Sequence, residues 1–150
     1  MTVTTRHAAD MQPARSHRGV TRWFAGRYLS GSLIHLGLAA FRPTAYESFA
    51  DGAYWPFIRH AWNSILVPNT RAVIVLLAAY ELIVGVLLLQ RGIRRRVGLI
   101  GATGFHVALL LFGWGIWIWA IPNLALLAIA LRSTVPGPSA LASQRDWDER

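Results

Sequence analysis

Long apolar stretches separated by short polar or basic segments fill the middle of the chain. A helix rises about 1.5 Å per residue, so roughly 20 apolar residues cross a hydrocarbon core of about 30 Å. The pattern therefore predicts an all-α fold, a bundle of four transmembrane helices. The predicted helices cover residues 23–41, 71–89, 97–112 and 116–131.

The connection between the first two apolar stretches is long and rich in aromatic residues. Pro56 fits a first helical position, and apolar side chains recur at helical spacing from there to Leu66. This pattern predicts a short amphipathic helix in the membrane interface, ended by Pro68 and Asn69. Two interpretations of the aromatic residues stay open, interface anchors or a lid over an outward-opening cavity. These residues are Tyr46, Phe49, Tyr54, Trp55, Phe57 and Trp62.

Both ends of the chain lack apolar periodicity. Residues 1–21 are polar and basic and contain Pro13 and Gly19, and residues 133–150 combine prolines with charges of both signs. We expect two disordered tails around one transmembrane domain, residues 22–132.

Small residues are frequent in the third apolar stretch, where they let helix backbones approach closely. We expect this helix to be a packed interior helix. The residues are Gly98, Gly101, Ala102, Gly104 and Ala108.

Composition supports lipid as the solvent. Hydrophobic residues make up 54% of the 150 residues and charged residues only 15%, which is too apolar for a soluble domain of this size. The 15 basic residues are all arginine, giving a formal net charge of +8, and most of them flank the apolar stretches. This placement indicates a role in membrane topology, and no nucleic acid is expected as a partner.

The arginines also predict an orientation. They cluster before the first helix, between residues 91 and 96, and at Arg132 after the fourth helix. Because loops rich in arginine stay in the cytoplasm, we expect a multi-pass protein of a bacterial inner cell membrane. Its N-terminus and C-terminus would both be cytoplasmic.

Polar residues inside the apolar stretches are the candidate chemistry, because an ionisable group at the bilayer centre costs about 2.5 to 3.5 kcal/mol unless it is paired. Counted at about 1.5 Å per residue from the flanking arginines, one such residue from each helix lies near mid-membrane, with that of the first helix somewhat nearer the outer face. We expect a shared polar cluster in the bundle interior. Its members are His35, Tyr80, Glu81, His106 and Asn123.

Three interpretations of these residues stay open: a site, a structural pair, or independent residues that face lipid or a cavity. In the first it is a site, where Glu81 carries a proton or accepts a hydrogen bond and the histidines act as relay or quinone-binding donors. In the second, Glu81 and a histidine satisfy each other and hold the helices in register. Different depths of His35 and His106 disfavour haem, and no spacing of residues indicates a metal site. Without cysteine, redox chemistry would need a bound cofactor, for which a quinone stays open.

Two segments carry a family resemblance. RYLSGSLIHLGLAAFRP and AYELIVGVLLLQRGIRRRVGL, with Glu81 ahead of Gly85 and a run of leucines, resemble the DoxX/DoxD-like proteins over about residues 22–132. The resemblance implies a four-helix membrane protein, a link to thiosulfate:quinone oxidoreductase or to oxidative-stress functions, and a role for Glu81. The chain differs from that family by having His35 where a basic residue often ends the first helix, and by its lack of cysteine.

We therefore expect an accessory or quinone-interacting subunit of a membrane redox system, with the lipid bilayer and another membrane or redox protein as partners. The sequence has no signature of a soluble enzyme, which gives those classes little support. Whether the chain has an enzymatic activity of another kind is left open. The first alternative is a structural or assembly partner of a membrane complex. The second is a carrier of small hydrophobic molecules, for which four short helices leave little room unless the chain forms an oligomer.

Overall fold

The structure, a computed structural model, describes residues 12–134, and this part of the chain contains helices and no strand. The predicted disorder of residues 1–11 and 135–150 lies outside the described residues. The prediction of an all-α fold is confirmed for the described part. Its helices are α2 (Gln12–Phe41), α3 (Pro56–Ala61), α4 (Thr70–Leu89), α5 (Ile93–Leu109) and α6 (Trp114–Arg132).

The first helix begins earlier than expected. α2 already includes residues 12–21, where the sequence predicted a tail. Pro13 falls in the first turn, a position that tolerates proline because its missing N–H would have no helical partner there. Val20 packs against the core that contains Phe24, so tertiary contacts extend the helix beyond the apolar stretch.

Three helical segments are long and apolar enough to cross a membrane, namely Pro56–Leu89, Ile93–Phe112 and Trp114–Arg132. This agrees with the prediction of a transmembrane protein. α2 is longer, with 30 residues, but it is not one of these segments. Arg27, His35 and several serines and glycines dilute its apolar character.

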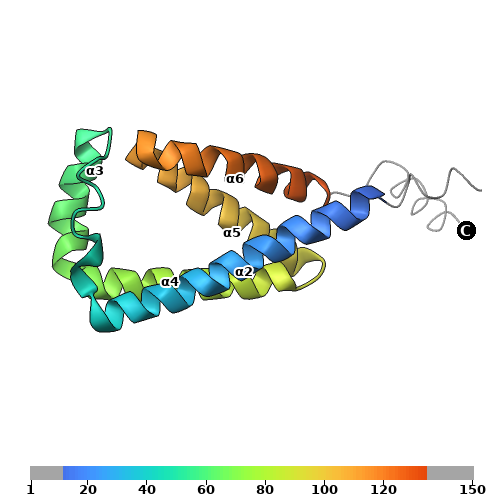
Figure 1. Ribbon diagram of the computed structural model, residues 1–150, viewed down its shortest axis with the longest axis horizontal. Helices are drawn as coiled ribbons and strands as arrows, with labels where there is room; N and C mark the ends of the chain where they lie inside the picture. The colour runs from blue at the N-terminus through green and yellow to red at the C-terminus, as the bar shows by residue number, and fades with distance from the viewer. Residues whose placement is uncertain (1–11, 135–150) are drawn as a thin grey trace, which may run out of the picture.

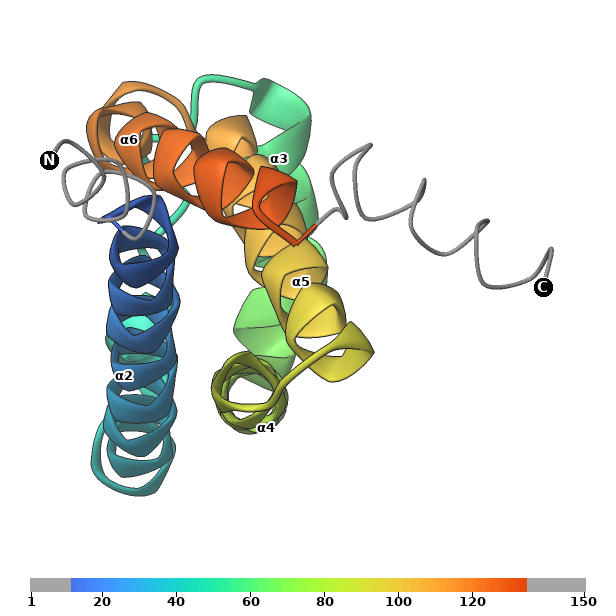
Figure 2. The same ribbon diagram turned by 90° about the vertical axis from the view of Figure 1, so that its right-hand side faces the viewer.

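The helices form two pairs that diverge. In Figure 1, α2 and α4 cross along one side of the molecule and α5 and α6 form the other, with the distance between the pairs increasing toward the end that carries α3. Figure 2, viewed along the bundle, places α4 between α2 and α5. α2 packs most extensively against α4, and its contact with α6 is much smaller. The two pairs therefore leave space between them at one end.

The segment between α2 and α4 closes this wide end. α3 begins at Pro56, as predicted, and continues through a π-helical turn (Trp62–Leu66) and a 3₁₀ turn (Val67–Asn69) directly into α4. The expected break at Pro68 is thus a bend within a continuous helical path. Figure 1 shows this segment running steeply across the axis of α4. Pro68 lacks an N–H and disrupts regular α-helical bonding there, which accounts for the change of direction.

The core lies at the narrow end, around Phe24, Leu88, Leu99 and Leu127, and small residues bring α4 and α5 together. A Cβ at Gly98 would lie 3.0 Å from the backbone nitrogen of Leu88. The expectation that this helix is interior is wrong. α5 buries one face only, and Ile100 and Val107 on its other side are 54% and 51% exposed.

Candidate functional site

A short hydrogen bond joins α2 to α4 in the middle of the bundle. Nδ1 of His35 lies 2.6 Å from Oε2 of Glu81, and the two side chains are only 13% and 9% exposed. Because an ionised carboxylate only accepts hydrogen bonds, Nδ1 of His35 carries the proton when Glu81 is charged. This arrangement pairs two of the predicted site residues across two helices.

Tyr46 extends the pair to a triad. Its hydroxyl lies 2.7 Å from Nε2 of His35, so a neutral His35 accepts a hydrogen bond from Tyr46 while it donates one to Glu81. Burial, followed by the Glu81 carboxylate, raises the pKa of Tyr46 above its ordinary value of 10.0, which keeps the hydroxyl protonated. Both ring nitrogens of His35 are therefore occupied, and its ring is held in one orientation.

A glycine on α2 and a backbone hydrogen bond of Tyr46 position the triad. A Cβ on Gly31 would lie only 2.8 Å from Oε2 of Glu81, so a glycine one turn before His35 lets the carboxylate lie against α2. Tyr46 lies in a short 3₁₀ turn that follows the end of α2, and its carbonyl accepts a hydrogen bond of 2.9 Å from Nε1 of Trp62. The helical path from residue 56 to residue 69, called the α3 segment below, thereby holds Tyr46 over His35.

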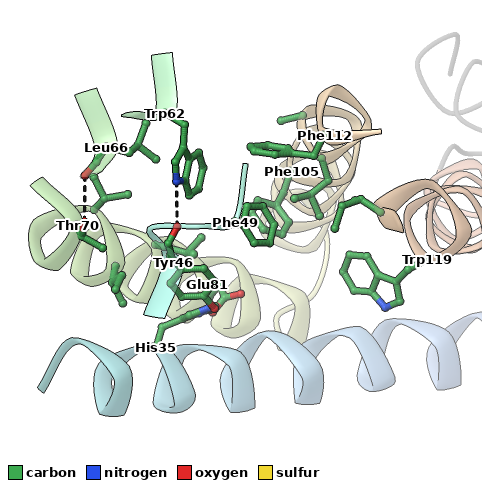
Figure 3. A pocket seen from close by; sticks show the side chains of 16 residues that line it. His35, Tyr46, Phe49, Trp62, Leu66, Thr70, Glu81, Phe105, Phe112 and Trp119 are labelled. Carbon is green, nitrogen blue, oxygen red and sulfur yellow. Dashed lines mark hydrogen bonds and ion pairs between the residues drawn. The ribbon is translucent and has the colours of Figure 1, made fainter. Parts of the chain in front are cut away.

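A cavity of about 460 Å³ opens next to the triad, in the space between the two helix pairs. Figure 3 shows His35, Tyr46 and Glu81 together at one side of it, with aromatic side chains around the rest. Phe49, Trp62 and Phe112 pack edge to face or tilted against one another and cap the α3 end. The finding corrects the expectation that four short helices leave little room for a cavity.

Part of the cavity wall is exposed. Phe49 and Trp119 are 36% and 37% exposed, and Ala108 on α5 is also exposed. The cavity therefore communicates with the surface of the bundle and is not sealed. A largely apolar cavity with few convergent polar groups is the usual form of a small-molecule site.

The other predicted site residues bond elsewhere. Tyr80 donates its hydroxyl hydrogen bond to the carbonyl of Gly101, and the side-chain amide of Asn123 donates to the carbonyl of Trp119 on its own helix. Nδ1 of His106 lies 2.8 Å from the carbonyl of Ala102. The expected single cluster is thus divided, with only His35 and Glu81 bonded to each other. Tyr46, the third member of the triad, was expected only as an anchor or lid residue.

His35 uses both ring nitrogens in hydrogen bonds, whereas His106 uses Nδ1 and has no partner at Nε2 among the described residues. Within residues 12–134, no three histidine, aspartate or glutamate side chains converge as a metal site. The triad is instead suited to exchanging hydrogen bonds and protons with a ligand in the cavity.

Comparison of the chain with protein-family models, with curated proteins and with solved structures finds no match. The assignment of a function therefore rests on the geometry of the triad and the cavity.

Proposed function

We propose that the chain is a quinone-interacting subunit of a membrane redox system, of the DoxX-like type, and that the cavity beside Glu81 binds the quinone ring. The observation that carries this proposal is the His35–Glu81–Tyr46 triad at the wall of an otherwise apolar cavity. Quinones are apolar rings whose two oxygens accept hydrogen bonds when oxidised and donate them when reduced. The Glu81 carboxylate can accept a hydrogen bond from a reduced quinone. When His35 is protonated and donates to the Tyr46 oxygen, the Tyr46 hydroxyl can donate to an oxidised quinone.

The size and lining of the cavity support a ligand of this kind. Its volume of about 460 Å³ falls within the roughly 300–1,000 Å³ typical of small-molecule sites. Phe105 contributes an aromatic ring to the lining, which suits contact with a flat ligand. The exposed part of the wall at Ala108 gives a molecule dissolved in lipid a lateral route to the triad.

The membrane placement in this proposal has four spans, with α2 as the first and both termini in the cytoplasm of a bacterial cell. α2 contains 30 residues, about 45 Å of helix at about 1.5 Å per residue, which is more than a bilayer core requires. Its outer face carries Leu33 and Ile34, which are 71% and 61% exposed and suited to lipid contact. The α3 segment would then lie in the outer interface as a cover for the cavity.

Binding of a short-chain ubiquinone to the full chain in nanodiscs tests the proposal. Trp62 and Trp119 line the cavity, so their fluorescence should be quenched in a saturable way. Glu81→Gln should weaken binding by about tenfold, which corresponds to about 1.4 kcal/mol. Extraction of quinone from protein purified in mild detergent, with an absorption spectrum, gives an independent measurement.

The matched control is Glu47→Gln, which makes the same chemical change at an exposed position outside the cavity. Its affinity should equal that of the unaltered chain. Quenching that rises linearly with quinone, or that is equally strong for an alkylbenzene without oxygens, would mean partition into lipid and would contradict the proposal.

One observation favours a second function, that of an assembly partner in a membrane complex. His35 and Glu81 satisfy each other at 2.6 Å, as a pair that only fixes helix register would do. Under this alternative, Glu81→Gln lowers thermal stability or releases a co-purifying protein while quinone binding is absent from every variant.

A further inference from the structure

His106 is a buried titratable group that the triad does not use. It lies on α5 and is 2% exposed, with its ring stacked on that of Trp119 at 5.0 Å between centroids. The carbonyl of Ala102 accepts the hydrogen bond from Nδ1, so in the neutral ring the proton is on Nδ1 and Nε2 is a bare acceptor. Among residues 12–134, no donor reaches this buried Nε2.

An acceptor left in this state is costly. A buried polar atom without a partner destabilises a protein, and such atoms in native proteins usually bond to internal water. A polar chamber next to the ring is therefore the first place to look for a partner of Nε2.

Such a chamber adjoins His106. It has a volume of about 50 Å³ and is lined by His106, Glu81, Arg27 and Tyr28, with aromatic rings completing the wall. One water requires roughly 10–15 Å³ and two to four polar partners, and the chamber provides both. Glu81 lines this chamber as well as the large cavity, together with Phe105 and Trp119.

We propose that the chamber binds one or two waters that connect Nε2 of His106 to the carboxylate of Glu81. The inference concerns a water site and holds whether or not a quinone occupies the large cavity. It makes His106 a hydrogen-bond partner of these waters, with Glu81 as their second partner.

The chamber also adjoins a second open space. Arg27 and Glu81 are shared with a groove of about 650 Å³ that follows α2 to Arg22. The guanidinium of Arg27 lies between the rings of Trp23 and Trp119, at 4.9 and 4.7 Å from their centroids, which holds the charge at the junction of chamber and groove.

Solid-state nitrogen NMR of the full chain in phosphatidylcholine nanodiscs, with labelled histidine, tests the inference. We expect magnetisation to pass from water to Nε2 of His106, with the signal assigned by its loss in His106→Phe. We also expect the Nε2 signal to lie at a different frequency in Glu81→Gln, because the bridging waters lose the carboxylate, while the transfer from water remains.

Tyr80→Phe is the matched control, because it removes a hydroxyl on the same helix as Glu81 but outside the chamber. It should leave both signals unchanged. Absence of transfer from water to Nε2 in the unaltered chain overturns the inference, whether or not quinone binds. If His106→Phe does not fold, the signal can be assigned by a through-space contact between labelled histidine and labelled tryptophan, because the His106 ring is stacked on Trp119. The presence or absence of transfer from water to this signal then tests the inference in the same way.

Discussion

At the scale of single residues, Glu81 unites the features of the site. It pairs with His35, lines the large cavity and borders the chamber at His106. A carboxylate at this depth is tolerated because His35 supplies a hydrogen bond of 2.6 Å with charge complementarity when protonated. The consequences of removing its charge are therefore both structural and chemical.

We predict that Glu81→Gln lowers the free energy of unfolding by about 1–3 kcal/mol. The oxygen of the glutamine amide can still accept the hydrogen bond from His35, but its NH₂ group becomes a buried donor without an acceptor. Thermal denaturation in detergent, followed by circular dichroism, measures the change. Glu47→Gln at an exposed position should stay within about 0.5 kcal/mol of the unaltered chain. Equal stability of the two variants would show that the pair with His35 contributes little.

Tyr46 provides a prediction about pH. Burial and the nearby Glu81 carboxylate raise the pKa of this phenol above 10.0, so folding favours the protonated form. Its stabilising effect should be complete below about pH 10 and should be lost as pH rises through the higher folded pKa. The phenolate absorbance difference between the unaltered chain and Tyr46→Phe should develop at higher pH than that of free N-acetyltyrosinamide. Development at the same pH or lower would contradict this reading.

The pairing of His35 with Glu81 could be predicted from depth, because counting along each helix places both residues in neighbouring layers. Depth alone does not specify the direction in which a side chain leaves its helix. Tyr80, His106 and Asn123 share the layer but face Gly101, Ala102 and Trp119 instead. Tyr46 lies beyond the end of α2 and reaches His35 only because the chain folds back. Only the interpretation of the aromatic segment as a lid over a cavity placed Tyr46 near the site.

At the scale of elements, the contact between α2 and α4 depends on a glycine at the site. A side chain on Gly31 would meet the Glu81 carboxylate at 2.8 Å, whereas Gly37 on the same helix has no atom within 4 Å of a built Cβ. These two positions form a matched pair within one helix.

We predict that Gly31→Ala displaces Glu81 and lowers the free energy of unfolding by about 1–3 kcal/mol, as overpacking does. Gly37→Ala should be neutral or stabilising by about 0.5–1 kcal/mol, because alanine favours the helix and meets no neighbour. Denaturation curves of the two variants measure the difference. A Gly31→Ala chain as stable as Gly37→Ala would mean that the carboxylate moves aside without loss.

The long elements were also the easier ones to predict. α4, α5 and α6 agree with the apolar stretches within a few residues, and α6 ends at Arg132 as expected. The early start of α2 and the bend after α3 depend on tertiary packing and on π and 3₁₀ turns, for which hydrophobic periodicity has no signal. The cavity arises from the divergence of two helix pairs, which is likewise a property of packing.

At the scale of the whole molecule, the proposed topology requires that α2 crosses the membrane together with the three more apolar segments. The chain contains no cysteine, so single cysteines report location without background. Three exposed positions suit this experiment: Gly19 near the start of α2, Ser48 between α2 and α3, and Gln90 between α4 and α5.

We predict that, in intact bacterial cells, Ser48→Cys reacts with a membrane-impermeant maleimide, whereas Gly19→Cys and Gln90→Cys react only after the membrane is opened. The reason is that α2 and α4 each carry the chain across once, so Gly19 and Gln90 share the cytoplasmic side rich in arginine. The unaltered chain should remain unlabelled throughout. If α2 does not cross, Gly19→Cys reacts together with Ser48→Cys, and the triad would then lie at the membrane surface, open to water, instead of inside a four-helix bundle.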